Sequence, residues 1–349
     1  MKVFVGLSGG VDSAVSAALL QKEGHEVVGA FIRIAIEGYP CTAGEDRISA
    51  MRVAAHLKIP FIEVDLSKEY QDMVFTESIK EFGEGLTPNP DVLCNREIKF
   101  GLFYDWARKQ GADLVATGHY AQIKDGELHI GADKEKDQSY FLWAVPSEVL
   151  KNVLFPIGHL TKPQVRKLAT KFGLPNAARK DSQGLCFLGP ISVADMLQKE
   201  LSPTPGQVLN DAGEVVGTHD GALLYTLGQR HGFALKGGSP NAAAHYVIAK
   251  DIAKNTITVS TSKFPKGASK TKVALVDTNW IPSATDIAGA TGLMARYRYR
   301  QELIPAELDA ESGQVVLLMP HFVPHGQSLV VYKQERCLGG GVIQESTVY

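Results

Sequence analysis

The first half of the chain alternates short apolar runs with segments in which apolar residues recur at helical spacing. The runs Lys2 to Leu7, Val27 to Ile32 and Phe61 to Val64 have the length of buried strands. Val11 to Lys22 and Asp46 to Leu57, which lie between them, have the periodicity of helices. Strands and helices that alternate in this order predict right-handed βαβ units and a parallel sheet.

The rest of this region carries local signals of the same kind. A helix is expected around Phe100 to Gln110, before a later strand at Leu114 to Thr117. The Asp-Gly pair within Ala121 to Ile130 predicts a β-hairpin. Thr161 to Phe172 begins with the Thr-x-x-Gln spacing of a capping box and is followed by Gly173, so it is predicted to be a helix.

The pattern changes after the turn-rich segment Ser202 to Gly206. Short β-rich runs such as Tyr246 to Ala249 follow it, and from about Thr271 runs such as Leu293 to Tyr299 and Ser328 to Tyr332 suggest a barrel of the six-stranded type. The predicted fold class is α/β in three parts: a parallel-sheet domain over 1–200, a small β-rich central domain over 205–268 and a C-terminal β-barrel over 270–349.

Composition narrows the function classes. Apolar residues make up 44% and charged residues 21%, which excludes a wholly disordered chain. The chain start turns at once into a glycine loop, so we expect neither a signal peptide nor a membrane segment, and we expect a cytoplasmic protein. The four cysteines, at positions 41, 94, 186 and 337, form no CxxC pair, which argues against structural zinc and against a secreted disulfide framework.

The formal charge is −2, so any attraction to nucleic acid has to be local. One basic stretch runs from Arg166 to Lys180. A second, Ala295 to Gln301, interleaves arginines at 296, 298 and 300 with tyrosines at 297 and 299. Alternating basic and aromatic residues suit phosphate contact and base stacking, and the alternative is a solvated strand face.

A polar glycine loop stands where the first strand meets the first helix, where open α/β sheets bind ligands. It consists of Gly6, Leu7, Ser8, Gly9, Gly10, Val11, Asp12 and Ser13. Glycine backbone N–H groups, serine hydroxyls and the helix dipole suit phosphate, and an acid beside them suggests Mg2+ held by Asp12. The alternative is a helix-capping loop. The loop is neither a Walker loop nor GxGxxG, and it resembles the SGGxDS loop of the PP-loop ATP pyrophosphatases.

Two cysteines stand in polar surroundings. Cys94 follows a proline-rich run, so we expect it on a stiff loop that presents its thiol just before a helix that begins near Ile98, with Asp91 as an acid/base candidate. Cys186 lies near Arg179 and Lys180, which would favour a thiolate or persulfide anion. The alternative for each is an inert or packing cysteine.

Taken together, the motifs resemble the bacterial tRNA-specific 2-thiouridylases, the MnmA/TrmU family. The resemblance covers nearly the whole chain through SGGVDS, CTAGEDR, TPNPDVLCNREIKF, ATGHYA, KDQSYFL, DSQGLCF, YTLGQR, RYRQ and CLGGG. It implies that the first domain is an adenine nucleotide alpha hydrolase-like PP-loop domain.

The resemblance also implies residue roles. Gly6 to Ser13 become the ATP loop, with Ile32, where relatives commonly have Met, and Gly118 as adenosine contacts. Cys94 becomes the nucleophile and Cys186 the persulfide carrier, while Cys41 and Cys337 are left as structural. The contacts to the target base and to tRNA become Asn89, Pro90, Asp91, His119, Lys136, Asp137, Gln138, Arg298, Tyr299 and Gln327.

The activity so implied is ATP-dependent replacement of O2 of the wobble uridine by sulfur, with ATP and Mg2+ but no tightly bound cofactor. The implied partners are the anticodon arm of tRNA and a sulfur donor, either a cysteine desulfurase or a relay protein. Two alternatives stay open at this point. One is another PP-loop synthetase or ligase, which would need no cysteines, and the other is a nucleotide-dependent RNA-binding protein without turnover.

Overall fold

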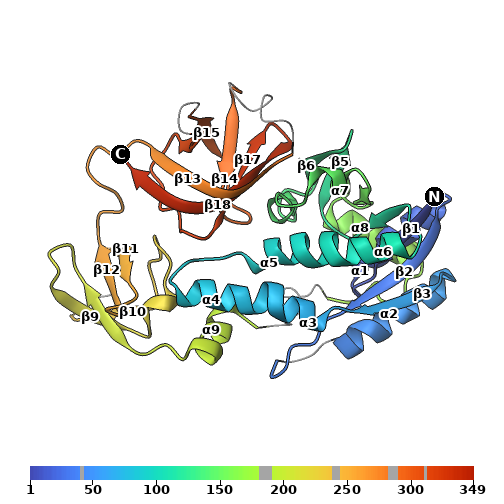
Figure 1. Ribbon diagram of the computed structural model, residues 1–349, viewed down its shortest axis with the longest axis horizontal. Coiled ribbons are helices and arrows are strands. Elements are labelled where there is room, and N and C mark those ends of the chain that lie inside the picture. Colours follow the sequence, from blue (N-terminus) through green and yellow to red (C-terminus); the bar gives the residue numbers. More distant parts are fainter. Residues whose placement is uncertain (40–42, 181–190, 238–243, 282–289, 310–312) are drawn as a thin grey trace.

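The computed structural model describes residues 1–349 except 40–42, 181–190, 238–243, 282–289 and 310–312. The described chain forms three sheets (Figure 1). In that view the α/β domain lies at the right, the central sheet at the left and the barrel above. The predicted α/β class with a β-rich second half is confirmed.

The N-terminal sheet is parallel, with strand order β3-β2-β1-β4-β7. The chain moves outward from β1 through β2 and β3, then returns to the other side of β1 with β4, so β1 and β4 flank the switch point of the sheet. The strands are β1 (Lys2–Gly6), β2 (Glu26–Arg33), β3 (Phe61–Asp65), β4 (Leu114–Ala116) and β7 (Val153–Leu154).

Helices cover both faces of this sheet. One apolar cluster joins it to α1 (Val11–Lys22), α2 (Ala43–Leu57) and α8 (Lys162–Lys171). A second cluster joins the opposite face to two long helical stretches and to α9 (Val193–Leu201). The stretches are α3 (Ser67–Tyr70), π-helix η1 (Gln71–Thr76) and α4 (Glu77–Gly83), then α5 (Pro90–Leu93), π-helix η2 (Cys94–Leu102) and α6 (Phe103–Lys109).

The second helical stretch corrects one expectation. We predicted a loop up to Cys94 and a helix from about Ile98, but the helix begins at Pro90. Asn89 caps it by accepting a hydrogen bond from the backbone N–H of Val92 at 3.3 Å, and proline suits the first helical position. The proline-rich composition concealed this helix start.

Two local predictions are confirmed. The hairpin is formed by β5 (Ala121–Lys124) and β6 (Glu127–Ile130), with positive φ at both turn residues, 53° at Asp125 and 79° at Gly126. The capping box of Thr161 and Gln164 opens α8. Between hairpin and α8 lie the short helices η3 (Ser139–Phe141) and α7 (Ser147–Leu150).

The central sheet has strand order β10-β9-β8-β12-β11 and a small core of its own. A single-turn helix, η4 (Ala222–Leu224), packs beside it. The strands are β8 (Gly206–Leu209), β9 (Val215–His219), β10 (Phe233–Leu235), β11 (Tyr246–Asp251) and β12 (Thr256–Ser260).

Six described strands close into the predicted C-terminal barrel, because β13 pairs with both β16 and β18. They are β13 (Thr271–Trp280), β14 (Leu293–Arg296), β15 (Ile304–Leu308), β16 (Val315–Leu317), β17 (Ser328–Lys333) and β18 (Arg336–Val348). The strand predicted over Leu293 to Tyr299 ends earlier, at Arg296, because the chain turns there and Arg300 has a φ of 62°.

The barrel is joined to the α/β domain through main-chain pairing. His129 of β6 pairs with Arg336 of β18, and the backbone N–H of Ile130 donates to the carbonyl of Glu335 at 2.8 Å. Asn279 of β13 donates to the carbonyls of Trp143 and Val145, at 2.7 and 3.0 Å. Every helix in the described part of the chain is too short or too polar to span a lipid bilayer.

Candidate functional site

The glycine loop connects β1 to α1 and therefore lies at the switch point of the sheet. Its two serines hold it together: the Ser8 backbone N–H donates to the Ser13 hydroxyl at 3.2 Å, and the two hydroxyls are also 3.2 Å apart. The Ser13 hydroxyl donates to the carbonyl of Gly10 at 3.2 Å. These hydrogen bonds within the loop hold it in a defined shape.

Gly9 is fixed by two distant segments. Its φ of 78° favours glycine, and an added Cβ would collide with the carbonyl of Asp46. Its own carbonyl accepts hydrogen bonds from Ser49 at 2.8 Å, Asn176 at 2.9 Å and Arg179 at 3.0 Å. Arg179 also pairs with Asp46. These contacts clamp the loop from α2 and from the segment after α8.

The two predicted adenosine contacts lie at the carboxyl ends of β2 and β4, the two strands that flank β1. Gly118 follows β4, and an added Cβ would lie 2.7 Å from the backbone N of Ser13, so only glycine allows this approach of β4 to α1. Ile32 lies one residue before the end of β2, half-buried against the core. Both residues therefore border the same edge of the sheet as the loop, and their roles stay predictions.

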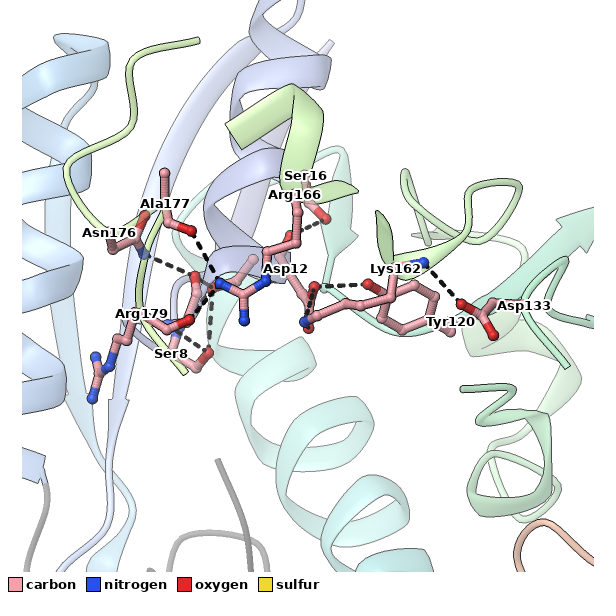
Figure 2. A network of polar contacts seen from close by, with 12 residues as sticks. Ser8, Asp12, Ser16, Tyr120, Asp133, Lys162, Arg166, Asn176, Ala177 and Arg179 are labelled. Carbon is pink, nitrogen blue, oxygen red and sulfur yellow. Dashed lines mark hydrogen bonds and ion pairs between the residues drawn. The ribbon is translucent and has the colours of Figure 1, made fainter. Parts of the chain in front are cut away.

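Asp12 lies in the first turn of α1, and its carboxylate receives donors from two other elements (Figure 2). The Lys162 ammonium lies 2.8 and 2.9 Å from the two carboxylate oxygens, and the Tyr120 hydroxyl donates to Oδ1 at 2.8 Å. The side chains of Asp12 and Lys162 are 31% and 13% exposed. Where the sequence suggested Mg2+, the structure places a lysine.

Cys94 corrects a second expectation, that its thiol is presented on a loop. It is the first residue of η2, its exposed fraction is 0%, and it lies in the core cluster beneath the sheet. Burial follows from the early helix start, because the cysteine then falls on the helix face that meets the core. Asp91, in the same helical stretch, is half-buried. Cys186 and Cys41 lie outside the described residues.

The segment before Cys94 contacts the barrel. The Asn89 amide donates to Gln327 Oε1 at 3.1 Å, and the Tyr140 hydroxyl donates to the same oxygen at 3.0 Å. Burial raises the pKa of the Tyr140 phenol, which therefore stays protonated as a donor. The structure thus brings together Asn89 and Gln327, which the resemblance implied as base and tRNA contacts. Tyr140 between them was missed.

A buried ion pair joins Asp137, a predicted tRNA contact, to Arg296 of the basic-aromatic stretch. Asp137 and Arg296 are 5% and 7% exposed and lie 2.5 Å apart. Asp137 also accepts hydrogen bonds from the backbone N–H groups of Gly131 and Ser139, at 2.9 and 3.1 Å, and Arg296 donates to the Tyr332 hydroxyl. The side chains of Asp137 and Arg296 therefore face each other inside the protein, so Arg296 is not a surface charge, and the tRNA contact of Asp137 stays a prediction.

His119 is likewise inside, not at the surface. Its Nδ1 lies 2.7 Å from the Thr117 hydroxyl, and its ring packs on Phe100 and Phe155. Burial, with a smaller contribution from the charge of Lys99, holds the pKa of the His119 imidazole well below its usual value of 6.5. The His119 imidazole is therefore neutral and buried, and its contact with tRNA stays a prediction.

The remaining predicted tRNA contacts gather on one face. Arg298 is exposed and donates to the carbonyl of Leu227 at 3.4 Å, while Tyr299 packs on Phe141 with ring centroids 4.7 Å apart. Arg300 donates to the carbonyl of Glu135 at 2.9 Å, so the 298–300 turn lies beside the loop at 133–138. Lys136 and Gln138 of that loop are half-buried, and Gln138 accepts from the backbone N–H of Tyr120.

Three family models match consecutive parts of the chain. They are described as a tRNA methyl transferase HUP domain over residues 1–190, a tRNA methyl transferase PRC-barrel domain over 194–261 and an aminomethyltransferase beta-barrel domain over 270–343. A tRNA-specific 2-thiouridylase MnmA of Lacticaseibacillus paracasei is 41% identical over 98% of this chain and 94% of its own length. The chain belongs to the tRNA-specific 2-thiouridylase family. The tRNA-specific 2-thiouridylase MnmA 2 of Geobacillus kaustophilus is 42% identical over 99% and 95% of the two chains.

Among solved structures, a 4-thiouridine synthetase in complex with RNA and bound ATP is similar over 57% of this chain and 49% of its own. The sequence identity is 19% and the TM-score is 0.36, too low to support a statement about substrate.

In this member of the 2-thiouridylase family, several residues of the site were missed from sequence. Lys162, Tyr120 and Asn176 contact the ATP loop from positions more than 100 residues away, as does Arg179, which was noted from sequence as part of a basic stretch and as a neighbour of Cys186. Neither periodicity nor a motif marks such contacts. The sequence gives one indirect signal for Lys162. The predicted helix start at Thr161 places it at the first position of a helix.

Proposed function

We propose that this chain is an ATP-dependent sulfurtransferase that adenylylates O2 of the wobble uridine of tRNA and replaces that oxygen with persulfide sulfur, giving 2-thiouridine. One combined observation carries the proposal. A chain that is 41% identical over nearly its full length to a tRNA-specific 2-thiouridylase places a preformed glycine loop at the switch point of its parallel sheet.

In the first step the uridine O2 attacks the α-phosphorus of ATP, and pyrophosphate leaves as the bond to the β-phosphate breaks. The Gly6 to Ser13 loop is suited to this polyanion, because glycine residues 9 and 10 let backbone N–H groups approach the phosphates closely and the α1 dipole favours negative charge. Gly118 and Ile32 are proposed to border the adenosine. This adenylylation turns O2, a poor leaving group, into part of AMP, which leaves readily.

Mg2+ enters the proposal as the counter-ion that ATP carries. Both Asp12 oxygens contact the Lys162 ammonium, and Oδ1 also accepts from Tyr120. A divalent cation on those oxygens would lie next to the ammonium and repel it. As placed, these residues do not fit a metal ion bound to Asp12, so we assign Mg2+ to the phosphates and derive no step from an Asp12-bound metal.

In the second step Cys186 is proposed to carry a persulfide delivered by a cysteine desulfurase or a relay protein. The outer sulfur replaces AMP at C2, and the Cys94 thiolate bonds to the inner sulfur of Cys186, which leaves a Cys94 to Cys186 disulfide. A thiol reductant then supplies the two electrons that restore both thiols. A disulfide requires the two Cα atoms to come within about 7 Å. Since Cys94 is buried, this step requires the segment that begins at Pro90 to move.

The tRNA surface is proposed to follow the face where the domains meet. Exposed Arg298, with Tyr299 beside it, and the half-buried Lys136, Gln138 and Gln327 lie there. Asn89, Pro90 and Asp91 are proposed to meet the target base, with Asp91 as acid/base. A cysteine pair whose disulfide must be reduced after each turnover suits the reducing cytoplasm, where we place the reaction.

The test is to incubate the full chain with ATP, a cysteine desulfurase with cysteine, a thiol reductant and tRNA transcripts, then to measure thiolated nucleoside by mass spectrometry and AMP release in parallel. Transcripts whose wobble uridine is replaced by cytidine are the matched control. The proposal predicts 2-thiouridine and AMP with the uridine transcripts alone. AMP release without any thiolated nucleoside would instead favour another PP-loop enzyme, and no release at all would favour a binding protein.

A further inference from the structure

Lys162 crosses from one helix to another to reach the ATP loop. It is the first residue of α8, whose start is fixed by the capping box, and its own backbone N–H donates to Asp133 at 2.8 Å. From this anchored position the side chain extends to Asp12 in the first turn of α1, and its ammonium lies 5.9 Å from the Tyr120 ring centroid (Figure 2). The ammonium therefore lies at a defined place beside the loop.

The cations around the loop contact different kinds of group. Arg179 donates to the Gly9 carbonyl and also pairs with Asp46, and Arg166 donates to the carbonyls of Ala177 and Arg179, so both guanidinium groups hold backbone in place. The Lys162 ammonium contacts a carboxylate side chain that is 31% exposed. A contact between two part-exposed side chains can rearrange when a ligand arrives, whereas the backbone contacts cannot break without distorting the loop.

The position of Asp12 poses an electrostatic problem that Lys162 solves. The α1 N-terminus is capped by Gly10 without a side-chain hydrogen bond, so its first N–H groups suit an anion. A carboxylate in that same first turn repels a phosphate chain. An ammonium held on the carboxylate cancels this repulsion and brings N–H donors to the edge where phosphate oxygens would lie.

Building on the proposed function, we propose that Lys162 binds the phosphate oxygens that leave as pyrophosphate, and that Asp12 is the positioning residue that holds the ammonium beside the loop. The fixed positive charge of the loop is then a lysine and not a metal ion on Asp12. An ammonium has three N–H groups, so it can keep one contact with Asp12 while it donates to phosphate.

The direct test is calorimetric titration of the full chain with inorganic pyrophosphate, in EDTA and without tRNA, which removes metal and turnover from the measurement. Lys162→Met is expected to weaken pyrophosphate binding about ten- to hundredfold, the loss of one charge-assisted hydrogen bond. Lys162→Arg, which keeps the charge, is expected to recover most of the affinity. Lys151→Met is the matched control, because Lys151 also pairs with a carboxylate, Glu148, but on the exposed surface.

Asp12→Asn removes the negative charge of the carboxylate but keeps an oxygen that can hold Lys162. An amide oxygen can still accept from Lys162, so metal-free pyrophosphate affinity is expected to stay within about threefold of wild type.

A matching rise in the inhibition constant of product pyrophosphate for Lys162→Met would show that the same contact operates during turnover. Should Lys162→Met fail to fold because it leaves Asp12 unpaired, the double variant Lys162→Met with Asp12→Asn removes both charges and is expected to bind pyrophosphate equally weakly.

Wild-type pyrophosphate affinity in a folded Lys162→Met or double variant would overturn the assignment. The outcome is independent of the proposed function. If wild type binds pyrophosphate through Lys162 but makes no thiolated nucleoside, the lysine assignment stands and the sulfurtransferase proposal fails. If wild type thiolates tRNA and the variants bind pyrophosphate normally, the sulfurtransferase proposal stands and the lysine assignment fails.

Discussion

The ATP loop and the Cys94 segment lie in one domain, yet they differ in how ready they are for chemistry. The loop is held in shape by contacts from Ser49, Asn176 and Arg179, and the Asp12 side chain beside it is 31% exposed. Cys94 is 0% exposed and part of the core. The loop is therefore shaped to receive a nucleotide in the conformation described, whereas the proposed sulfur transfer at Cys94 requires the helix around it to rearrange. In the proposed mechanism this difference separates the two half-reactions, because only sulfur transfer needs a change of conformation.

The largest effect is expected at Cys94. Cys94→Ala is predicted to lower thiolation about a thousandfold or more while the adenylylation step still releases pyrophosphate, because the thiol is proposed to act only in the second step. Thiolated nucleoside and pyrophosphate, measured on the same reactions, check this. Cys337→Ala is the matched control, since Cys337 is also fully buried but lies in the barrel, and it should retain activity. Undiminished thiolation by Cys94→Ala would show that sulfur transfer does not require this buried thiol.

The next largest effect concerns stability at the domain boundary. Arg296→Met is predicted to lower the free energy of unfolding by about 3 to 5 kcal/mol, because it leaves Asp137 buried without its cation. Arg298→Met, two residues away but exposed, should change it by less than about 0.5 kcal/mol. Urea denaturation followed by fluorescence measures both. Equal effects would mean that the buried network contributes no more than surface charge.

A pH effect is expected from His119, next to Gly118. Its pKa is low in the folded protein because of burial, so the unfolded chain binds a proton below pH 6.5 that the folded chain does not. Stability should therefore fall as pH falls below 6.5, by up to about 1.4 kcal/mol per pH unit from this group. His119→Gln should flatten the slope between pH 6.5 and 5 relative to wild type, whereas exposed His159→Gln should not. Identical slopes in wild type and His119→Gln would refute burial of this imidazole.

The smallest effect is expected on tRNA affinity. Arg298→Ala should reduce the slope of log K against log salt by about one, the loss of one phosphate contact. Lys22→Ala is the control, because Lys22 lies in the last turn of α1, at the opposite end of that helix from the ATP loop. Filter binding at several salt concentrations gives the slopes. An unchanged slope for Arg298→Ala would leave the 298–300 turn as a solvated surface.

Features encoded by neighbouring residues were predictable from sequence, and features made by distant residues were not. The strand and helix alternation, the Asp125-Gly126 turn and the α8 capping box are local, and each is confirmed. The Lys162 to Asp12 pair joins residues 150 positions apart, and the Arg296 to Asp137 pair joins residues 159 apart. The sequence does not indicate either pairing, because only the fold decides which charges face each other.

Cys94 marks a different failure, in which a local signal was present but outweighed. Asn89 before Pro90 is a helix start, yet the second proline at 88 favoured a loop prediction. The role of Cys186 rests on the family resemblance alone, since it lies outside the described residues.

The shared strand edge between β6 and β18 bears on whether the first domain is an autonomous folding unit. The barrel completes a sheet that begins in the hairpin at 121–130 and supplies Arg296 for Asp137 and Tyr332 for the same core cluster as Trp143. A chain cut before Thr271 would expose the edge of β6, an apolar surface and an unpaired buried carboxylate at once. Such a fragment would be prone to aggregation, and the nucleotide-binding module of this chain could not readily be exchanged or inherited apart from its barrel.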